Sequence, residues 1–101
     1  MATLGIEGPF EQEQPLAPGE LVWVQLGERD GYRDCAVAVT AAGSGDEGGT
    51  YVLRVEDVAV TCVHTWDGDI DYSAWHLGCN VRNVGDVAVK RWWVTVGVVH
   101  V

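Results

Sequence analysis

The stretch that decides the fold is Val58-Ala59-Val60-Thr61-Cys62-Val63-His64-Thr65-Trp66-Asp67-Gly68-Asp69-Ile70-Asp71-Tyr72-Ser73-Ala74-Trp75-His76-Leu77-Gly78-Cys79-Asn80-Val81. Apolar side chains alternate with others on both sides of an acidic tip at residues 67–71. Such alternation in two neighbouring runs predicts two antiparallel strands that share one buried face. The stretch therefore predicts a long β-hairpin. Its expected cross-strand pairs are Trp66 with Trp75, His64 with Leu77, Cys62 with Cys79, and Val60 with Val81.

Shorter strand patterns follow in the rest of the chain, separated by turn signals. The strand-like runs are Leu21 to Leu26, Cys35 to Thr40, Tyr51 to Val55 and Ala88 to Val101, and the turns are Asp30-Gly31 and Asn83-Val84-Gly85-Asp86. The alternation that ends at Val55 resumes at Val58 with the opposite parity. One strand cannot keep the same face buried across such a switch, so we expect a bulge or break near Glu56-Asp57.

The first nineteen residues contain no periodic apolar pattern. Glycine and proline interrupt this segment repeatedly, and Glu11 to Gln14 is polar on every side. We therefore predict two parts, an extended N-terminal arm at 1–19 and a single β-domain at 20–101. A chain of 101 residues is long enough for one hydrophobic core and too short for two.

Together, the six or seven expected strands and the absence of a helical period predict an all-β fold, either a single antiparallel β-sandwich or a small barrel. The last strand has apolar residues on both faces, so we expect it to be buried on both sides or to meet another subunit with one face. The two sets are Trp92, Val94, Val96 and Val98 on one face, and Trp93, Thr95, Gly97 and Val99 on the other.

The segment from Trp75 to Asp86, followed by Trp92-Trp93-Val94-Thr95-Val96, resembles the strand, Asn-x-Gly-Asp turn and Trp-x-Val strand of immunoglobulin-like sandwich modules. The resemblance covers about a quarter of the chain. Bacterial domains related to cell adhesion and cellulose-binding modules share this phrase. It implies a sandwich architecture, and, since those modules continue for several strands beyond the phrase, a different or permuted topology.

The charge balance excludes several classes of partner. Fifteen acidic against six basic residues give a formal charge of −9. Nucleic-acid binding is not expected, because its affinity comes from Lys and Arg side chains that neutralise phosphates, and anionic membranes are disfavoured for the same reason. An acidic surface with Lys90 as the single lysine fits salt adaptation and a GC-rich gene equally well. The start of the chain lacks a signal peptide pattern, so we expect synthesis in the cytoplasm.

The three cysteines, Cys35, Cys62 and Cys79, lack the spacing of a metal site. Cys62 and Cys79 face each other in the expected register, so a disulfide between them is open, although buried free thiols are the favoured interpretation. The alternating Asp67, Asp69, Asp71 and Ser73 match the first ligands of a calcium loop, but Tyr72 and Gly78 stand where such a loop needs glycine and glutamate. A solvated acidic hairpin tip is favoured, and we expect no metal.

The histidines are not joined by a serine or carboxylate partner in any catalytic pattern. We expect His64 to be a structural residue in or near the core and His76 to lie on the opposite, polar face. Five tryptophans in 101 residues fit a core layer, interface anchors or a sugar-stacking platform.

With no catalytic or cofactor-binding signature, we expect no enzyme and no cofactor. The leading hypothesis is a structural or interaction protein, most specifically a small virion component of a tailed virus such as a capsid decoration, neck or tail protein. Its partners would be other protein subunits in a homo-oligomer or a capsid or tail lattice. The alternative is a carbohydrate-binding β-sandwich module with exposed tryptophans. The expected interface residues are Phe10, Pro15, Leu16, Trp92 and Trp93.

Overall fold

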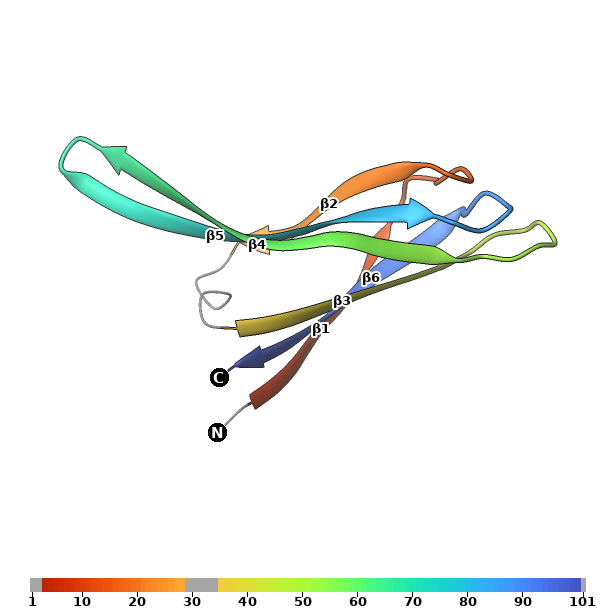
Figure 1. The fold of residues 1–101 in the computed structure, drawn as a ribbon, viewed down its shortest axis with the longest axis horizontal. Helices are drawn as coiled ribbons and strands as arrows, with labels where there is room; N and C mark the ends of the chain where they lie inside the picture. Colours follow the sequence, from red (N-terminus) through yellow and green to blue (C-terminus); the bar gives the residue numbers. More distant parts are fainter. Residues whose placement is uncertain (1–2, 29–34, 101) are drawn as a thin grey trace.

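A computed structural model describes residues 3–28 and 35–100 (Figure 1). This part of the chain contains six β-strands and no helix, which confirms the all-β prediction. The strands are β1 (Thr3–Gln12), β2 (Leu21–Glu28), β3 (Cys35–Ser44), β4 (Leu53–Asp67), β5 (Ile70–Asn83) and β6 (Arg91–His100). The turn predicted at Asp30-Gly31 lies outside the described residues.

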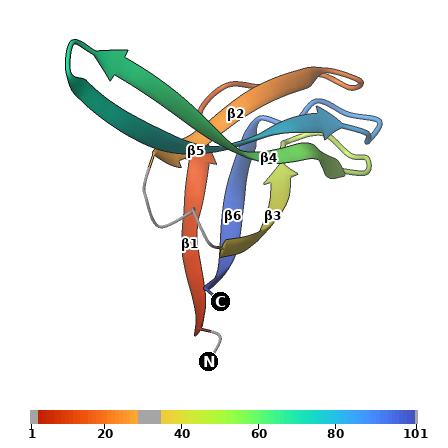
Figure 2. The same ribbon diagram turned by 60° about the vertical axis from the view of Figure 1, so that its left-hand side comes forward.

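The six strands form two antiparallel sheets of three strands each. One sheet has the order β1-β6-β3, and the other has the order β2-β5-β4. In Figure 1 the two sheets lie close together at one end and diverge toward the tip of the β4–β5 hairpin. Figure 2 shows the hairpin slanting across the strands of the other sheet. The fold is therefore a two-layer β-structure that opens toward one end.

The core lies between the sheets and is built from the inward faces of the two central strands. Alternation places one set of side chains of each strand inward. The buried apolar residues are Leu77, Cys79 and Val81 of β5, Trp92, Val94, Val96 and Val98 of β6, Val24 of β2, and Leu16 and Val89 from connections. Trp92 and Trp93 thus point to opposite faces of β6, as their adjacency in the sequence requires.

The connection between β1 and β2 crosses from one sheet to the other and is held by backbone pairing. Leu16 and Val89 exchange two N–H to O=C hydrogen bonds of 2.9 Å. The indole Nε1 of Trp92 donates to the carbonyl of Gln14 at 2.6 Å. Leu16 is fully buried beside Trp92 in the same cluster. These contacts fix the crossing segment over the closed end of the core.

Asn83 is the one buried polar residue among the described residues, and it is fully hydrogen-bonded. Its Nδ2 donates to the carbonyls of Leu16 at 3.0 Å and Val87 at 2.9 Å, and its Oδ1 accepts from the N–H of Gly85 at 2.9 Å. Its own backbone pairs with Gly19 and Glu20. The Asn83-to-Asp86 turn predicted from the sequence is therefore present, and it also holds the β1–β2 connection.

The prediction of a separate N-terminal arm is wrong for Thr3–Gln12, because these residues form β1 and pair with β6 along its length. The strand tolerates Gly8 and Pro9 because it lies at the edge of its sheet, where a proline without N–H removes no required pairing. The register shifts between Glu7 and Phe10, and the Gly8-Pro9 bond is cis.

The long hairpin is present, but its predicted register is wrong by four residues. Cys62 lies opposite Trp75, not Cys79, and Trp66 lies opposite Asp71, not Trp75. The reason is the turn: strand pairing continues to Asp67 and Ile70, so only two residues connect the strands. Gly68 takes a φ of 62°, a conformation that a two-residue turn requires and glycine adopts readily.

The bulge expected near Glu56-Asp57 is confirmed. The β4–β5 register shifts between Glu56 and Ala59, and Asp57 has a positive φ of 53°. Before the bulge, Leu53 and Val55 face the core. After it, Val60 faces the same side, so the extra residue corrects the change of parity in the sequence.

We predict that Asn83→Ala lowers the free energy of unfolding by about 2–4 kcal/mol, because it removes the hydrogen bonds of Asn83 to the carbonyl of Val87 and the N–H of Gly85 and one of the two bonds to the carbonyl of Leu16. Asn83→Asp is the matched variant: it retains the acceptor for Gly85 but loses both Nδ2 donors, so we also expect destabilisation. Urea unfolding measures both. A change below about 0.5 kcal/mol for Asn83→Ala would contradict this role.

Candidate interaction surfaces

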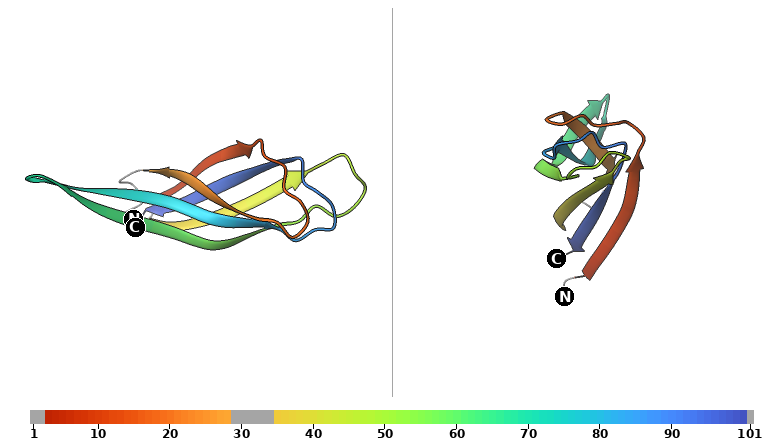
Figure 3. Two further views of the ribbon diagram at one scale, coloured as in Figure 1. Left: turned by 90° about the horizontal axis from the view of Figure 1, so that it is seen from above. Right: turned by 90° about the vertical axis from the view of Figure 1, so that its right-hand side faces the viewer.

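The β4–β5 hairpin extends beyond the rest of its sheet (Figure 3). Pairing of β2 with β5 ends at Glu28 opposite His76, and His76 lies opposite Thr61. Toward the turn, the described part of β5 pairs with β4 alone. The molecule measures 56 × 36 × 19 Å, and this two-stranded end lies at one extreme of the long axis (Figure 3).

Apolar side chains are exposed on both faces of the projecting hairpin. Val63 is exposed on one face and Trp66, with 69% of its surface accessible, on the other. The ring of His64 stacks on Trp66 with 5.6 Å between centroids and 20° between planes. His64 is exposed, so the prediction of a histidine in or near the core is wrong. The sheets diverge at this position, and within the described residues the side chains of Cys62, His64 and Trp66 on the inward face of the hairpin remain exposed.

The outer face of the β2-β5-β4 sheet carries a second exposed aromatic residue, Trp23. Its ring lies flat against Gly78 of β5: a Cβ at position 78 would lie 2.3 Å from the ring atom Cζ2. Glycine is therefore required at position 78 for this ring position. The ring covers the backbone of Gly78, which is buried, while 53% of the Trp23 surface remains accessible.

A depression of about 330 Å³ lies beside Trp23 and spans all three strands of the sheet. Its lining is Trp23, Gln25, Thr61, Val63, His76, Leu77 and Gly78. Gln25 Nε2 lies 3.1 Å from His76 Nδ1. An amide nitrogen only donates, so this contact is a hydrogen bond in the tautomer whose Nδ1 carries no proton. His76 lies on the outer face, as predicted, and it is the only titratable residue in the lining.

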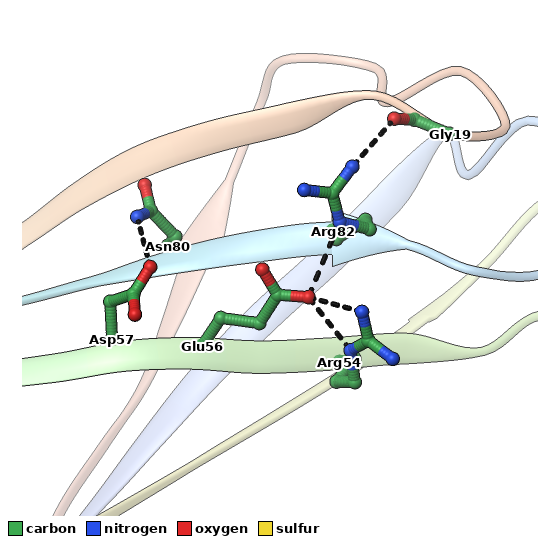
Figure 4. Close-up of polar contacts among 6 residues, drawn as sticks. All are labelled: Gly19, Arg54, Glu56, Asp57, Asn80 and Arg82. Atoms are coloured by element: carbon green, nitrogen blue, oxygen red, sulfur yellow. Dashed lines mark hydrogen bonds and ion pairs between the residues drawn. The ribbon is translucent and has the colours of Figure 1, made fainter.

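Farther along the same face, charged side chains are paired with one another (Figure 4). Glu56 accepts hydrogen bonds from Arg54 and, at 3.3 Å, from Arg82, while Asn80 donates to Asp57 at 3.1 Å. Hydrogen bonds from the two arginines hold the pKa of Glu56 below its usual range. The arginines are thus engaged within the chain, and the neutral aromatic half of this face is its more available part.

The predicted interface residues are placed very differently from one another. Leu16 and Trp92 are buried in the chain's own core, so they are not available to a partner. Phe10 is partly buried against the core cluster around Leu77. Pro15 is exposed. Trp93 is 37% exposed on the outer face of β6.

The acidic tip has the backbone of a tight hairpin and not of an open calcium loop. Asp67 lies on β4 while Asp71 and Ser73 lie on β5, with Asp69 in the turn. The side chains of Asp67 and Asp71 lie outside the described residues. Among the residues that are described, no group of three or more His, Cys, Asp or Glu side chains is placed to hold a metal ion.

The cysteines are free, and Cys62 and Cys79 are not opposite each other. Cys62 is exposed on the projecting hairpin, so the prediction of a buried free thiol is wrong for this residue. Cys79 is fully buried, and burial raises the pKa of its thiol. Cys35 is partly buried.

We predict that Ellman's reagent modifies Cys62 rapidly in the folded protein and Cys79 only after unfolding, because the thiolate is the reactive form and must be accessible. Cys62→Ser should remove the fastest phase, and Cys79→Ser should leave it unchanged. A disulfide between the two, or equal rates of modification, would contradict the observed register.

Comparison with protein-family models, curated proteins and solved structures found no match to this chain. Within residues 3–28 and 35–100, no helix is long and apolar enough to cross a membrane. The candidate surfaces are therefore judged on their geometry and chemistry alone.

Proposed function

We propose that the protein is a non-enzymatic interaction protein that docks onto another protein subunit through the end of the β4–β5 hairpin. The observation that carries this proposal is the projecting two-stranded segment with exposed apolar residues on both faces. An isolated hairpin is only marginally stable in water, and exposed large apolar side chains favour contact with a partner. Trp66 is the anchor, because tryptophan contributes strongly to protein interfaces when it is covered.

We further propose that the docking partner belongs to the virion of a tailed virus. A small all-β subunit with a projecting hairpin suits attachment to a larger assembly, since the hairpin reaches a neighbour while the core remains with its own subunit. Neighbouring genes for capsid, portal or tail proteins would support this setting, and neighbours that all encode metabolic enzymes would count against it.

The exposed Cys62 provides a direct test of hairpin docking. In a Cys35→Ala background, a thiol-directed photocrosslinker on Cys62 should attach the partner in an extract of the native source. Trp66→Ala should weaken the partner's binding about 30-fold, as expected for loss of a central aromatic anchor, and should therefore remove the crosslinked product.

Val84→Ala serves as the matched control, because Val84 is also exposed and apolar but lies outside the hairpin. Its crosslinked product should be unchanged. No crosslinked partner, or a partner retained at full yield by both Trp66→Ala and Val63→Ala, would contradict docking through the hairpin.

A second candidate function, carbohydrate binding, is favoured by the arrangement of Trp23. A flat, half-exposed indole suits the apolar face of a sugar ring. The Gln25 amide, the Thr61 hydroxyl and the His76 imidazole border the same depression and offer donors and acceptors for hydroxyl groups.

Titration with a panel of neutral oligosaccharides tests this candidate. If it holds, a binding sugar changes the tryptophan fluorescence of the native protein, and Trp23→Ala abolishes the response. Trp66→Ala is the matched control and should retain binding. A flat calorimetric and fluorescence response across the whole panel would exclude the carbohydrate function.

A further inference from the structure

The outer face of the β1-β6-β3 sheet is an apolar surface that no described element of the chain covers. Its central row comes from β6, whose outward residues are Trp93, Thr95, Gly97 and Val99. The sequence shows this strand to be apolar on both faces, and the structure buries only the set that includes Trp92. The outward set is only partly buried, and Trp93 remains 37% exposed.

The flanking strands extend this surface with uncharged residues. The exposed outward residues of β3 are Ala36, Ala38, Thr40 and Ala42. On β1, Ile6 lies opposite Gly97 and is 73% exposed, the highest value among the large apolar residues that the structure describes. The charged residues at the margin of the described face are Glu11, opposite Trp93, and Arg91, which is exposed on the same side of β6 two residues before Trp93. We name this surface the neutral face.

The charge distribution limits which partner can cover the neutral face. The chain carries a formal charge of −9, so two copies repel each other over most of their surfaces. The charged residues of the neutral face are confined to one margin, where Glu11 and Arg91 carry opposite signs, and the rest of the described face brings no charge into a contact. It is therefore the surface through which two like-charged copies can approach and bury apolar area.

The shape of the neutral face is also self-complementary. Register pairs place Ile6, Gly97 and Ala38 in one row across β1, β6 and β3. A twofold axis parallel to β6 lays β1 of one copy over β3 of the other, so that Ile6 faces Ala38 in both directions and Gly97 faces Gly97. A large side chain then lies over a small one at each end of the row, and both copies contribute the same residues, as an isologous contact requires.

We propose that the neutral face is the interface of a homodimer in which two copies pack sheet against sheet. This inference rests on the proposed function, because it treats the protein as a subunit that assembles with others. It adds that one of its partners is a second copy of the same chain. It is separate from the hairpin, which remains available for a different subunit.

Sedimentation velocity of the full chain over a range of concentrations tests the dimer. The native protein should sediment as a dimer, and Ala38→Lys should sediment as a monomer because it places a charge within the contact, opposite Ile6 of the other copy. The substitution also lowers the net negative charge by one, which reduces general repulsion. Dissociation would therefore report the buried contact and not the overall charge.

Ala17→Lys is the matched control, since Ala17 is exposed in the β1–β2 connection and outside the neutral face. It should remain a dimer. Thr40→Lys provides a second variant if Ala38→Lys does not fold, with the melting temperature of each variant measured. Three results would overturn the proposal. The native protein could be a monomer, the folded Ala38→Lys or Thr40→Lys variant could remain a dimer, or Ala17→Lys could dissociate the dimer equally well.

The dimer and hairpin docking are tested separately. We expect these variants to leave crosslinking from Cys62 unchanged, so failure of the dimer is distinguished from failure of hairpin docking.

Discussion

The fold depends on the buried hydrogen bonds of Asn83, which join the two sheets where they meet. The residue ends β5 in one sheet, shapes the turn toward β6 in the other, and binds the carbonyl of Leu16 in the crossing connection. Without this side chain, the N–H of Gly85 and the carbonyl of Val87 would lose the partners that Asn83 gives them, and the carbonyl of Leu16 would keep only its bond from Val89. Burial of polar groups without partners is costly. Satisfying them with one side chain allows Leu16, Val89 and Trp92 to close the end of the core.

The core is closed at one end of the molecule, and at the other end the two sheets separate. The sheets diverge toward the turn of the β4–β5 hairpin (Figure 1), and the side chains of Cys62, His64 and Trp66 are exposed on that hairpin. The outer face of the β1-β6-β3 sheet lies elsewhere, and away from its margin at Glu11 and Arg91 its described residues are uncharged. The same fold thus presents a projecting hairpin and a flat neutral face in separate places, which suits a subunit with two contacts.

Sequence patterning predicted the faces of the strands better than their registers. Alternation fixes which side of the hairpin faces inward, and a shift by an even number of residues preserves it, so the pattern could not distinguish Cys79 from Trp75 as the partner of Cys62. The parity change at Glu56-Asp57 was informative because a bulge is the simple way to accommodate it. The strand at Thr3–Gln12 was missed because its glycines and proline conceal a pairing that only an edge strand permits. The position of Trp23 on Gly78 depends on contacts between strands far apart in the chain, which local pattern does not reveal.

The central claim is that one end of the molecule is held by Asn83 and its neighbours while the hairpin beyond His76 is stabilised weakly by its own chain. Hydrogen exchange of backbone amides tests this directly. The amides of Leu16, Asn83 and Val89 should be among the slowest to exchange, and those of Cys62 to Trp66 should exchange much faster in the isolated protein. Equal protection of the hairpin and the closed end would contradict the claim.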